Sequence, residues 1–218
     1  MSAGGDHKGG NVSAKALTKD PLNLIIAGVG GQGNVRMSLL IGEALVREGL
    51  MVTIGETYGA SQRGGAVMSH VRISKEAECS PFISDGRADV VLGMEPVETL
   101  RMLGQFGNPD VVTVVNTRPI YSIDVTGGDE EYPSMDRLLD TIGELSARTW
   151  PVNATEEAQK LGNPILANVI LIGALVGCGA LPLDEASLEP ALRESFPQDL
   201  EANMTAFNRG IELVRRQG

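Results

Sequence analysis

The sequence predicts an α/β fold: a layered sandwich built on a mainly parallel, Rossmann-like sheet. Short β-branched apolar runs alternate along the chain with segments whose apolar residues recur at helical spacing. A glycine-rich turn joins the first such run to the first helical segment. Two later runs, Asp89–Gly93 and Asp110–Val115, are short and apolar, as is typical of parallel strands covered on both faces.

The first predicted unit is strand, glycine turn, helix and strand. The strand covers Leu22–Ala27 and the turn Gly28–Gly33, and Gly49 suits the C-terminal end of the helix. Leu50–Ile54 then forms the second strand of a βαβ unit that we expect to be right-handed. The residues that recur at helical spacing between them are Met37, Leu40, Ile41, Ala44 and Leu45.

The remaining elements follow from the same periodicities. Alternating residue types predict a strand with unlike faces at Ala66–Ser74. The polar stretch Asp124–Tyr132 is predicted to be an exposed loop. Helices are predicted at Pro96–Leu103, Ser134–Ser146, Glu156–Leu161, Pro164–Val176, Leu188–Ser195 and Leu200–Arg215.

Length and composition suit one folded domain. The chain has 218 residues, of which 42% are hydrophobic and 21% charged. Residues 1–20 are small and polar, so we expect a disordered N-terminal tail followed by a single α/β domain over 21–218. The tail lacks the apolar segment of a signal peptide, and no run is long enough to span a bilayer.

Charge and cysteine content exclude several classes of partner and cofactor. A net charge of −10 argues against nucleic acid or an anionic membrane as a partner, because phosphate binding needs clustered Lys and Arg. Cys79 and Cys178 are too few for a four-thiolate iron–sulfur site and do not suggest a disulfide framework. A reducing cytoplasm is therefore the expected location.

The turn GVGGQG at Gly28–Gly33 has the pattern G-x-G-x-x-G, between a strand and a helix. Its backbone N–H groups and the helix dipole favour a bound anion, so this turn is a candidate binding site. Glu56 lies where a dinucleotide-binding fold places its ribose-binding acid, about 20 residues further on. The alternative is that the glycines only permit close packing of strand and helix. The candidate residues here are Gly28, Gly30, Gly31, Gln32, Gly33 and Glu56.

A second candidate segment, Gly55–Gly65, reads GETYGASQRGG. A guanidinium followed by two glycines could form a backbone nest suited to a phosphate or carboxylate, and a tyrosine could stack on a ligand. The alternative is an ordered loop at a subunit interface, which we favour slightly. The candidate residues in it are Tyr58, Ser61, Gln62, Arg63, Gly64 and Gly65.

No catalytic or metal-binding residue is identified. His70 and Arg72 share a strand face, but a lone strand histidine is more often packed and hydrogen-bonded than catalytic. Glu95 and Glu98 flank Pro96, yet no cluster has metal-ligand spacing and no nucleophile has an identifiable base.

Several stretches, taken in order, resemble the γ-type subunits of 2-oxoacid:ferredoxin oxidoreductases (the pyruvate/ketoisovalerate oxidoreductase family). The resemblance covers nearly the whole folded chain, and within the family it is strongest to small subunits of the indolepyruvate-type enzymes. The segment that contains QRGG is the most specific. The stretches are GVGGQG at Gly28–Gly33, GETYGASQRGGAVMSHVRIS at Gly55–Ser74, ADVVLGMEPVETLR at Ala88–Arg101, VVNTRP at Val114–Pro119, GNPILANVILIGAL at Gly162–Leu175 and NMTAFNRG at Asn203–Gly210.

The resemblance implies one subunit of a complex that oxidatively decarboxylates a 2-oxoacid to an acyl-CoA and passes electrons to ferredoxin. Indolepyruvate or another aryl 2-oxoacid is the favoured substrate, and coenzyme A is the cosubstrate. The thiamine motif GDG is absent and two cysteines cannot hold a cluster, so this chain should carry no cofactor and be inactive alone. Thiamine diphosphate, Mg2+ and iron–sulfur clusters are then expected in a large partner subunit.

Two expectations follow for the assembly and for competing functions. Met94, Pro96, Val97 and the Gly55–Gly65 loop should lie on a surface that is covered only in the complex. The competing functions are an independent NAD(P)-binding dehydrogenase, which the glycine turn and Glu56 favour, and a nucleotide-binding regulatory module.

Overall fold

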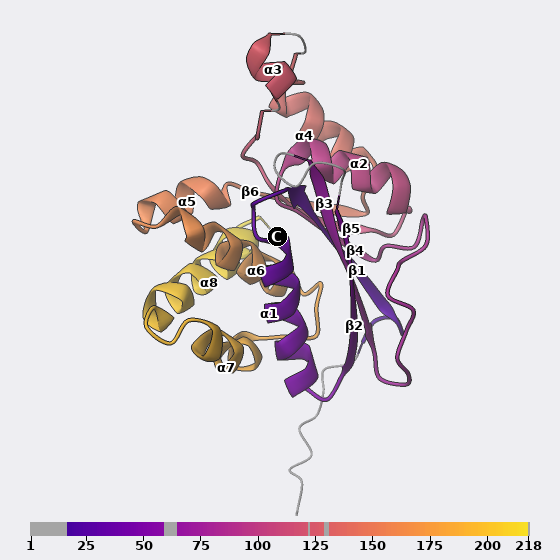
Figure 1. The fold of residues 1–218 in the computed structure, drawn as a ribbon, viewed down its shortest axis with the longest axis vertical. Helices are drawn as coiled ribbons and strands as arrows, with labels where there is room; N and C mark the ends of the chain where they lie inside the picture. The colour runs from indigo at the N-terminus through magenta and orange to yellow at the C-terminus, as the bar shows by residue number, and fades with distance from the viewer. Residues whose placement is uncertain (1–16, 59–64, 122, 129–130, 218) are drawn as a thin grey trace, which may run out of the picture.

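The computed structural model describes residues 17–58, 65–121, 123–128 and 131–217. They build one six-stranded sheet in the order β2-β3-β1-β4-β5-β6, with helices on both faces (Figure 1). The α/β class and the mainly parallel sheet are confirmed, because five of the six strands run in one direction. The strands are β1 (Leu22–Val29), β2 (Met51–Tyr58), β3 (Ala66–Ser74), β4 (Val90–Gly93), β5 (Val112–Asn116) and β6 (Arg148–Val152).

The helices largely follow the predicted order. The stretch predicted as one helix from Pro164 begins with a short 3-10 turn, η1, and the helix predicted from Leu188 begins three residues earlier. The prediction of a loop at Asp124–Tyr132 was wrong at its start, because Ile123–Gly127 forms a short helix. The helices are α1 (Asn34–Arg47), α2 (Pro96–Phe106), α3 (Ile123–Gly127), α4 (Met135–Glu144), α5 (Ala154–Lys160), η1 (Pro164–Leu166), α6 (Ala167–Gly177), α7 (Glu185–Ser195) and α8 (Leu200–Arg215).

Strand β3 corrects the predicted pairing of the first βαβ unit. It lies between β1 and β2 and pairs antiparallel with both, so the two strands joined by α1 run in the same direction without touching. The alternating pattern predicted the residues that form β3, but it did not predict the strands with which β3 pairs. Strand β6, with the sequence RTWPV, was not predicted, because Pro151 interrupts its β-branched pattern.

Each face of the sheet has its own apolar core. Along β1, Leu24 and Ile26 point into the core beneath α1, α6, α7 and α8, whereas Ile25 and Ala27 point into the core beneath α2 and α4. Figure 1 shows these two helical layers on opposite sides of the sheet. The chain therefore leaves β1 toward one face, through α1, and leaves β4 toward the other, through α2. A crevice opens between the carboxyl ends of such strands, which is where open α/β sheets bind ligands.

Candidate functional site: a cleft at the ends of β1, β4 and β5

A cleft of about 1020 Å³ lies at this crevice. Its wall is formed by the glycine turn, the first turn of α1, the segment after β5 and the start of α6. None of the described residues that line it is acidic. The lining residues are Gly31, Gln32, Gly33, Arg36, Met94, Asn116, Arg118, Pro119, Ile120, Tyr121, Thr126, Thr155, Pro164, Ile165, Ala167, Asn168 and Leu171.

The glycine turn needs its glycines for two different reasons. Gly31 and Gly33 have φ angles of 100° and 91°, a left-handed conformation that side chains with a Cβ rarely adopt. At Gly28 a Cβ would lie 2.6 Å from Oε1 of Gln32, so only glycine fits against the folded turn. Gly33 also stands directly before α1, which leaves the first-turn N–H groups of that helix beside the cleft.

Gln32 holds the turn together rather than offering its amide to a ligand. Its Oε1 accepts a hydrogen bond from the N–H of Val29 at 2.6 Å, and its Nε2 donates to the carbonyl of Met94 at 3.2 Å. The side chain of Asn168, on α6, donates to the Gln32 carbonyl at 2.8 Å. The turn is thereby fixed to β4 and to α6 before any ligand binds.

Asn116 forms the floor of the cleft at the end of β5. Only 4% of it is exposed, and its Nδ2 donates to the Met94 carbonyl at 3.2 Å and to Oγ1 of Thr155 at 3.1 Å. Its Oδ1 has no hydrogen-bond partner. A buried acceptor left without a donor is costly, so a ligand that brings an N–H or O–H to this floor would be stabilised there.

Two arginines give the cleft a positive mouth. Arg36, in the first turn of α1, stacks its guanidinium 4.4 Å from the ring centre of Phe196 and donates to the Ser195 carbonyl at 3.5 Å. Arg118 is exposed, and within the described residues it forms no ion pair or hydrogen bond. Two guanidiniums beside free helix N–H groups attract an anion, in a chain whose net charge is −10.

Glu56 does not occupy the position predicted for a ribose-binding acid. Its carboxylate accepts hydrogen bonds from Ser38 of α1 at 2.9 Å and from Ser69 of β3 at 2.7 Å. Because β3 separates β2 from β1, Glu56 does not line the cleft. The dinucleotide-binding interpretation of this residue is therefore wrong.

The second candidate segment is only partly described. Residues 59–64, which include Ser61, Gln62, Arg63 and Gly64, and the side chain of Tyr58 lie outside the described part of the chain. The end of the segment meets the glycine turn, because the N–H of Gly30 donates to the Gly65 carbonyl at 2.9 Å. The structure thus brings Gly65 beside Gly30, two candidates that lie far apart in the sequence.

Two residues expected on a partner-covered surface are buried within the chain itself. Met94 is 1% exposed, and Pro96 lies in the first turn of α2 against the sheet. Val97 is half-buried. Met94 packs in the core beneath α1 and α6, and Pro96 is buried at the start of α2, so that part of the predicted interface was wrong.

His70 is packed, as predicted. It is 3% exposed, lies edge-on to the rings of Phe82 and Phe106, and accepts a hydrogen bond on Nδ1 from the N–H of Ile83 at 3.3 Å. Burial lowers the pKa of this imidazole. Arg72, on the same strand face, donates to Oδ1 of Asn23 at 3.0 Å.

Glu95 caps helix α2 from a buried position. Its Oε2 accepts from the N–H of Glu98 at 2.9 Å, and its Oε1 accepts from the hydroxyl of Tyr132. Burial, followed by that hydrogen bond, raises the pKa of the Tyr132 phenol far above its usual range. Burial also raises the pKa of Glu98. Neither glutamate lines the cleft, but Oε1 of Glu95 also accepts from the N–H of Ile120 at 3.5 Å, so Glu95 joins the start of α2 to the segment after β5.

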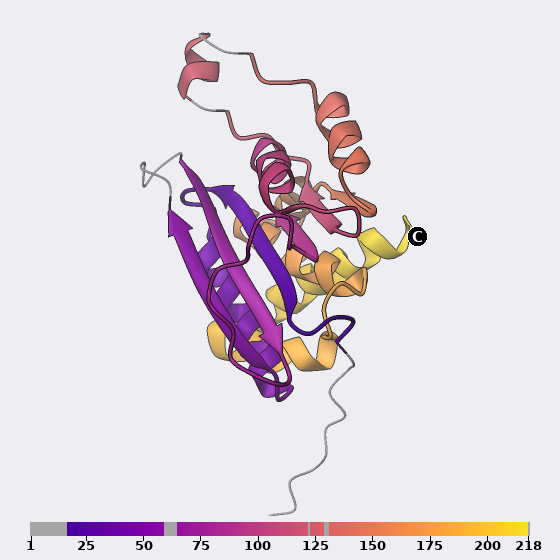
Figure 2. The same cartoon turned by 90° about the vertical axis from the view of Figure 1, so that its right-hand side faces the viewer.

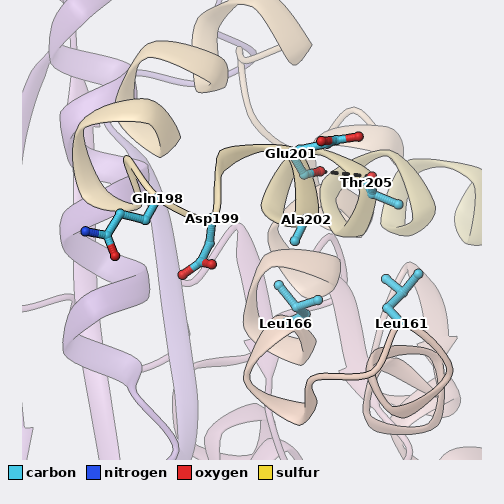
Figure 3. Close-up of a pocket in the computed structure, with 7 residues that line it drawn as sticks. All are labelled: Leu161, Leu166, Gln198, Asp199, Glu201, Ala202 and Thr205. Carbon is cyan, nitrogen blue, oxygen red and sulfur yellow. Dashed lines mark hydrogen bonds between the residues drawn. The ribbon is translucent and has the colours of Figure 1, made fainter.

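A second pocket, of about 430 Å³, lies between the end of α5 and the start of α8 (Figure 3). Leu166 and Leu161 point toward Ala202 and Thr205 of α8. The Thr205 hydroxyl donates to the Glu201 carbonyl at 2.9 Å. No cationic residue is among those that line it, and it shares none with the glycine turn. The larger cleft is therefore the better candidate for an anionic ligand.

Sequence reasoning found the glycine turn but missed most of the cleft. Asn116 and Arg118 lie in the stretch VVNTRP, and Asn168 lies in GNPILANVILIGAL. A polar residue at the end of a predicted parallel strand was the available signal for Asn116. No group of His, Cys, Asp or Glu in the described residues could hold a metal ion, and Cys79 and Cys178 are free. The described helices include none that is long and apolar enough to cross a membrane.

Comparison with known proteins agrees with this architecture. Residues 23–213 match the family model for pyruvate ferredoxin/flavodoxin oxidoreductase. A protein of Archaeoglobus fulgidus, named indolepyruvate oxidoreductase subunit IorB, is 38% identical over 190 residues, which are 87% of this chain and 93% of the relative. The subunit of the same name from Thermococcus kodakarensis is 35% identical over 88% of this chain and 96% of its own.

Solved structures share the fold at lower identity. A 2-oxoglutarate:ferredoxin oxidoreductase from Magnetococcus marinus, solved with 2-oxoglutarate, coenzyme A and succinyl-CoA bound, matches 91% of this chain with a TM-score of 0.71 and 24% identity, over 32% of its own length. The γ subunit of a keto/oxoacid ferredoxin oxidoreductase from Geobacter sulfurreducens matches 89% of this chain and 99% of its own, with a TM-score of 0.65 and 22% identity. From the family match and the full-length relatives, the chain belongs to the pyruvate ferredoxin/flavodoxin oxidoreductase family.

Proposed function

We propose that this chain is the small subunit of an indolepyruvate-type 2-oxoacid:ferredoxin oxidoreductase. The observation that carries the proposal is the 38% identity to a subunit of that name over nearly the full length of both chains. The complex would oxidatively decarboxylate an aryl 2-oxoacid, form an acyl-CoA, release CO2 and pass two electrons to ferredoxin. The competing dehydrogenase function is not favoured, because Glu56 is bonded away from the glycine turn.

The chemistry of decarboxylation is assigned to a large partner subunit. The chain lacks a thiamine-binding GDG motif, and its two cysteines, Cys79 and Cys178, cannot supply the four thiolates of a cluster. Thiamine diphosphate, Mg2+ and iron–sulfur clusters would then be held by the partner. Free cysteines also suit the reducing cytoplasm in which we place the complex.

The role proposed for the cleft is to hold coenzyme A. Arg36 and Arg118 and the first-turn N–H groups of α1 suit phosphate groups, and the unpaired Oδ1 of Asn116 suits an N–H of the adenine or of the pantetheine arm. Coenzyme A is bound in the related Magnetococcus enzyme, which shares the fold. Arg63, near the Gly65 end of the neighbouring loop, is proposed as a third cation of the same site.

The assembly is tested by co-expression with the large subunit. The two chains should elute together and reduce ferredoxin with indolepyruvate, whereas this chain alone should neither bind thiamine diphosphate or iron nor turn over any 2-oxoacid. Turnover by the isolated chain with cofactors supplied, or separate elution of the two chains, would contradict the proposal.

The coenzyme A site is tested in the complex with Arg118→Ala. Loss of one charge-assisted contact, worth roughly 1.5–3 kcal/mol, should raise the apparent KM for coenzyme A about ten- to a hundredfold. Reduction of the clusters by indolepyruvate before coenzyme A is added should stay unchanged. The matched control is Arg137→Ala, an exposed arginine of α4 away from the cleft. An intact Arg118→Ala complex with normal dependence on coenzyme A would remove this site.

A further inference from the structure

The two edges of the sheet are protected very differently. Edge strand β6 contains Pro151, whose carbonyl accepts a hydrogen bond from Nε2 of Gln217 at 3.0 Å, and Arg148 stacks on Trp150. Proline and charged residues are the usual means of preventing a further strand from pairing with an edge. Strand β2, at the other edge, has the sequence MVTIGETY and contains neither proline nor lysine. It pairs with β3 over all eight residues without a bulge, and Figure 2 shows it as the outermost strand.

An apolar stripe on α1 lies beside this open edge. Val35, Leu39 and Val46 are 37%, 58% and 55% exposed, and their spacing of four and seven residues places them on one side of the helix. Gly42 lies between them and identifies that side, because a Cβ there would be 3.1 Å from Cδ1 of Ile54, on β2. The stripe therefore borders β2, as the adjacency of the two elements in Figure 1 also shows.

The neighbouring side of α1 is occupied within the chain. Arg47 forms ion pairs with Glu43 at 2.7 Å and with Glu194 of α7, and Arg36 stacks on Phe196 just beyond α7. Helix α7 thus covers the charged flank of α1. No described residue bonds to the outer edge of β2, so the stripe and this edge form one surface that the described part of the chain leaves open. We call it the α1–β2 surface: Val35, Leu39, Val46, Val52 and Ile54.

We infer that the α1–β2 surface is an interface between two copies of this chain related by a two-fold axis. A strand that adds to β2 must present apolar residues at alternate positions toward α1. Strand β2 has this pattern, because Val52 and Ile54 both face α1. Antiparallel pairing of β2 with β2 of a second copy keeps those residues on the same face of a continuous sheet. The surface is therefore its own complement, as a two-fold interface requires.

The helical stripe is self-complementary in the same arrangement. When two α1 helices run antiparallel about a point next to Gly42, Leu39 of each copy faces Val46 of the other. Gly42, between them, faces Ile54 of its own chain, so the two helices would meet through Leu39 and Val46 on either side of it. The closed pair would remove from water the most exposed apolar side chains of α1.

Charge at this surface is compatible with a second copy of an acidic chain. The flank of the stripe carries Arg36, Glu43 and Arg47, which together bear one net positive charge, although the whole chain has a net charge of −10. Glu43 is already neutralised by Arg47, and the carboxylate of Glu56 is turned toward Ser38 and Ser69. With Glu48 at the end of α1 the side chains of the flank balance to zero, so the acidic surplus of the chain is not concentrated beside the stripe.

The first test is the mass of the full chain in solution, by sedimentation equilibrium. We expect twice the 23.0 kDa of one chain at micromolar concentration. Leu39→Glu should weaken the dimer at least about a hundredfold, because it places a charge in the apolar contact of both copies. Leu145→Glu is the matched control: this leucine is also exposed, at 42%, but follows α4, and its substitution should leave the dimer intact.

The second test fixes the geometry by cross-linking. With Cys79 and Cys178 replaced by Ser, the double variant Leu39→Cys and Val46→Cys should form a disulfide-linked dimer on oxidation, whereas Leu39→Cys with Leu145→Cys should not. A chain that sediments as a monomer, or a dimer that resists Leu39→Glu, overturns the inference. If the chain is monomeric and Leu39→Glu instead releases it from the large subunit, the surface belongs to that subunit.

Discussion

The two helical layers on the sheet reach stability by different means. The layer that contains α6 and α8 is close-packed, and its glycines let helix backbones touch: a Cβ on Gly173 would lie 2.0 Å from the Phe207 carbonyl oxygen. The layer that contains α2 instead buries ionisable groups, among them His70, Glu95 and Glu98. Close packing of helix backbones therefore stabilises the first layer, whereas hydrogen bonds to buried polar groups stabilise the second. Substitutions in the first layer should therefore lower the free energy of unfolding by steric overlap, and those in the second by loss of hydrogen bonds.

The largest effect is expected from closing the contact between α6 and α8. A Cβ at Gly210 would lie 2.0 Å from the Ile170 carbonyl oxygen, so Gly210→Ala forces the helices apart. We expect the free energy of unfolding, measured in urea, to fall by at least about 3 kcal/mol. Gly143→Ala is the control, because Gly143 of α4 is exposed with nothing within 4 Å, and alanine there should stabilise the helix by roughly 0.5–1 kcal/mol. Equal responses at the two positions would refute the contrast.

A smaller loss is expected from the polar layer. Tyr132→Phe removes the hydroxyl that donates to the buried Oε1 of Glu95, and loss of a donor to a buried acceptor should cost about 1–3 kcal/mol. Tyr121→Phe provides the control. Tyr121 lies edge-on to Tyr132 at 5.1 Å and is 57% exposed, so phenylalanine keeps the ring contact. Its unfolding midpoint should be unchanged, and a similar loss from both variants would contradict the role of the Glu95 bond.

The smallest effect is a dependence on pH. The pKa of His70 in the fold lies below its ordinary value of 6.5 because the ring is buried. As pH falls below that value, the unfolded chain takes up a proton that the folded chain does not, so stability is lost on acidification. Glu98, whose pKa is raised by burial, acts in the opposite sense as pH rises above its ordinary value of 4.5.

Comparison with a variant isolates the His70 contribution. Between about pH 7.5 and pH 5.5 the unmodified chain should lose roughly 1 kcal/mol more than His70→Leu, whatever the absolute stability of the variant. Parallel stability curves for the two proteins would show that His70 titrates normally in the fold.

Local pattern was enough to predict most elements, and the reasons are visible in particular residues. Helix α1 and its glycine start were predicted because Met37, Leu40 and Ile41 recur on one buried side and Gly49 follows in a left-handed conformation. The position of β3 between β1 and β2 was not predictable, because strand order depends on pairing between distant residues. Strand β6 was missed because Pro151 is tolerated only at an edge, which the sequence does not reveal.

Only the part of the candidate site that is encoded in one local stretch of sequence was predicted. The glycine turn is local and carries its own signal. Glu56 had the right spacing, but the inserted β3 moves it away from the turn. Asn116, Thr155 and Asn168 come from three different elements, so only the fold brings them to one cleft.

Strand β1 also has a consequence for how the chain folds. Both of its neighbours come from later in the sequence: Leu22 pairs with Ile73 of β3, and Leu24 pairs with Val90 of β4. The hairpin of β2 and β3 is the one strictly local pairing among the described strands. Long loops must close before β1 can pair with β3 or with β4. The hairpin of β2 and β3 can therefore form early, whereas β1 joins the sheet late. A chain emerging from the ribosome would thus hold β1 unpaired until β3 has been made, and unpaired on its other side until β4 has been made.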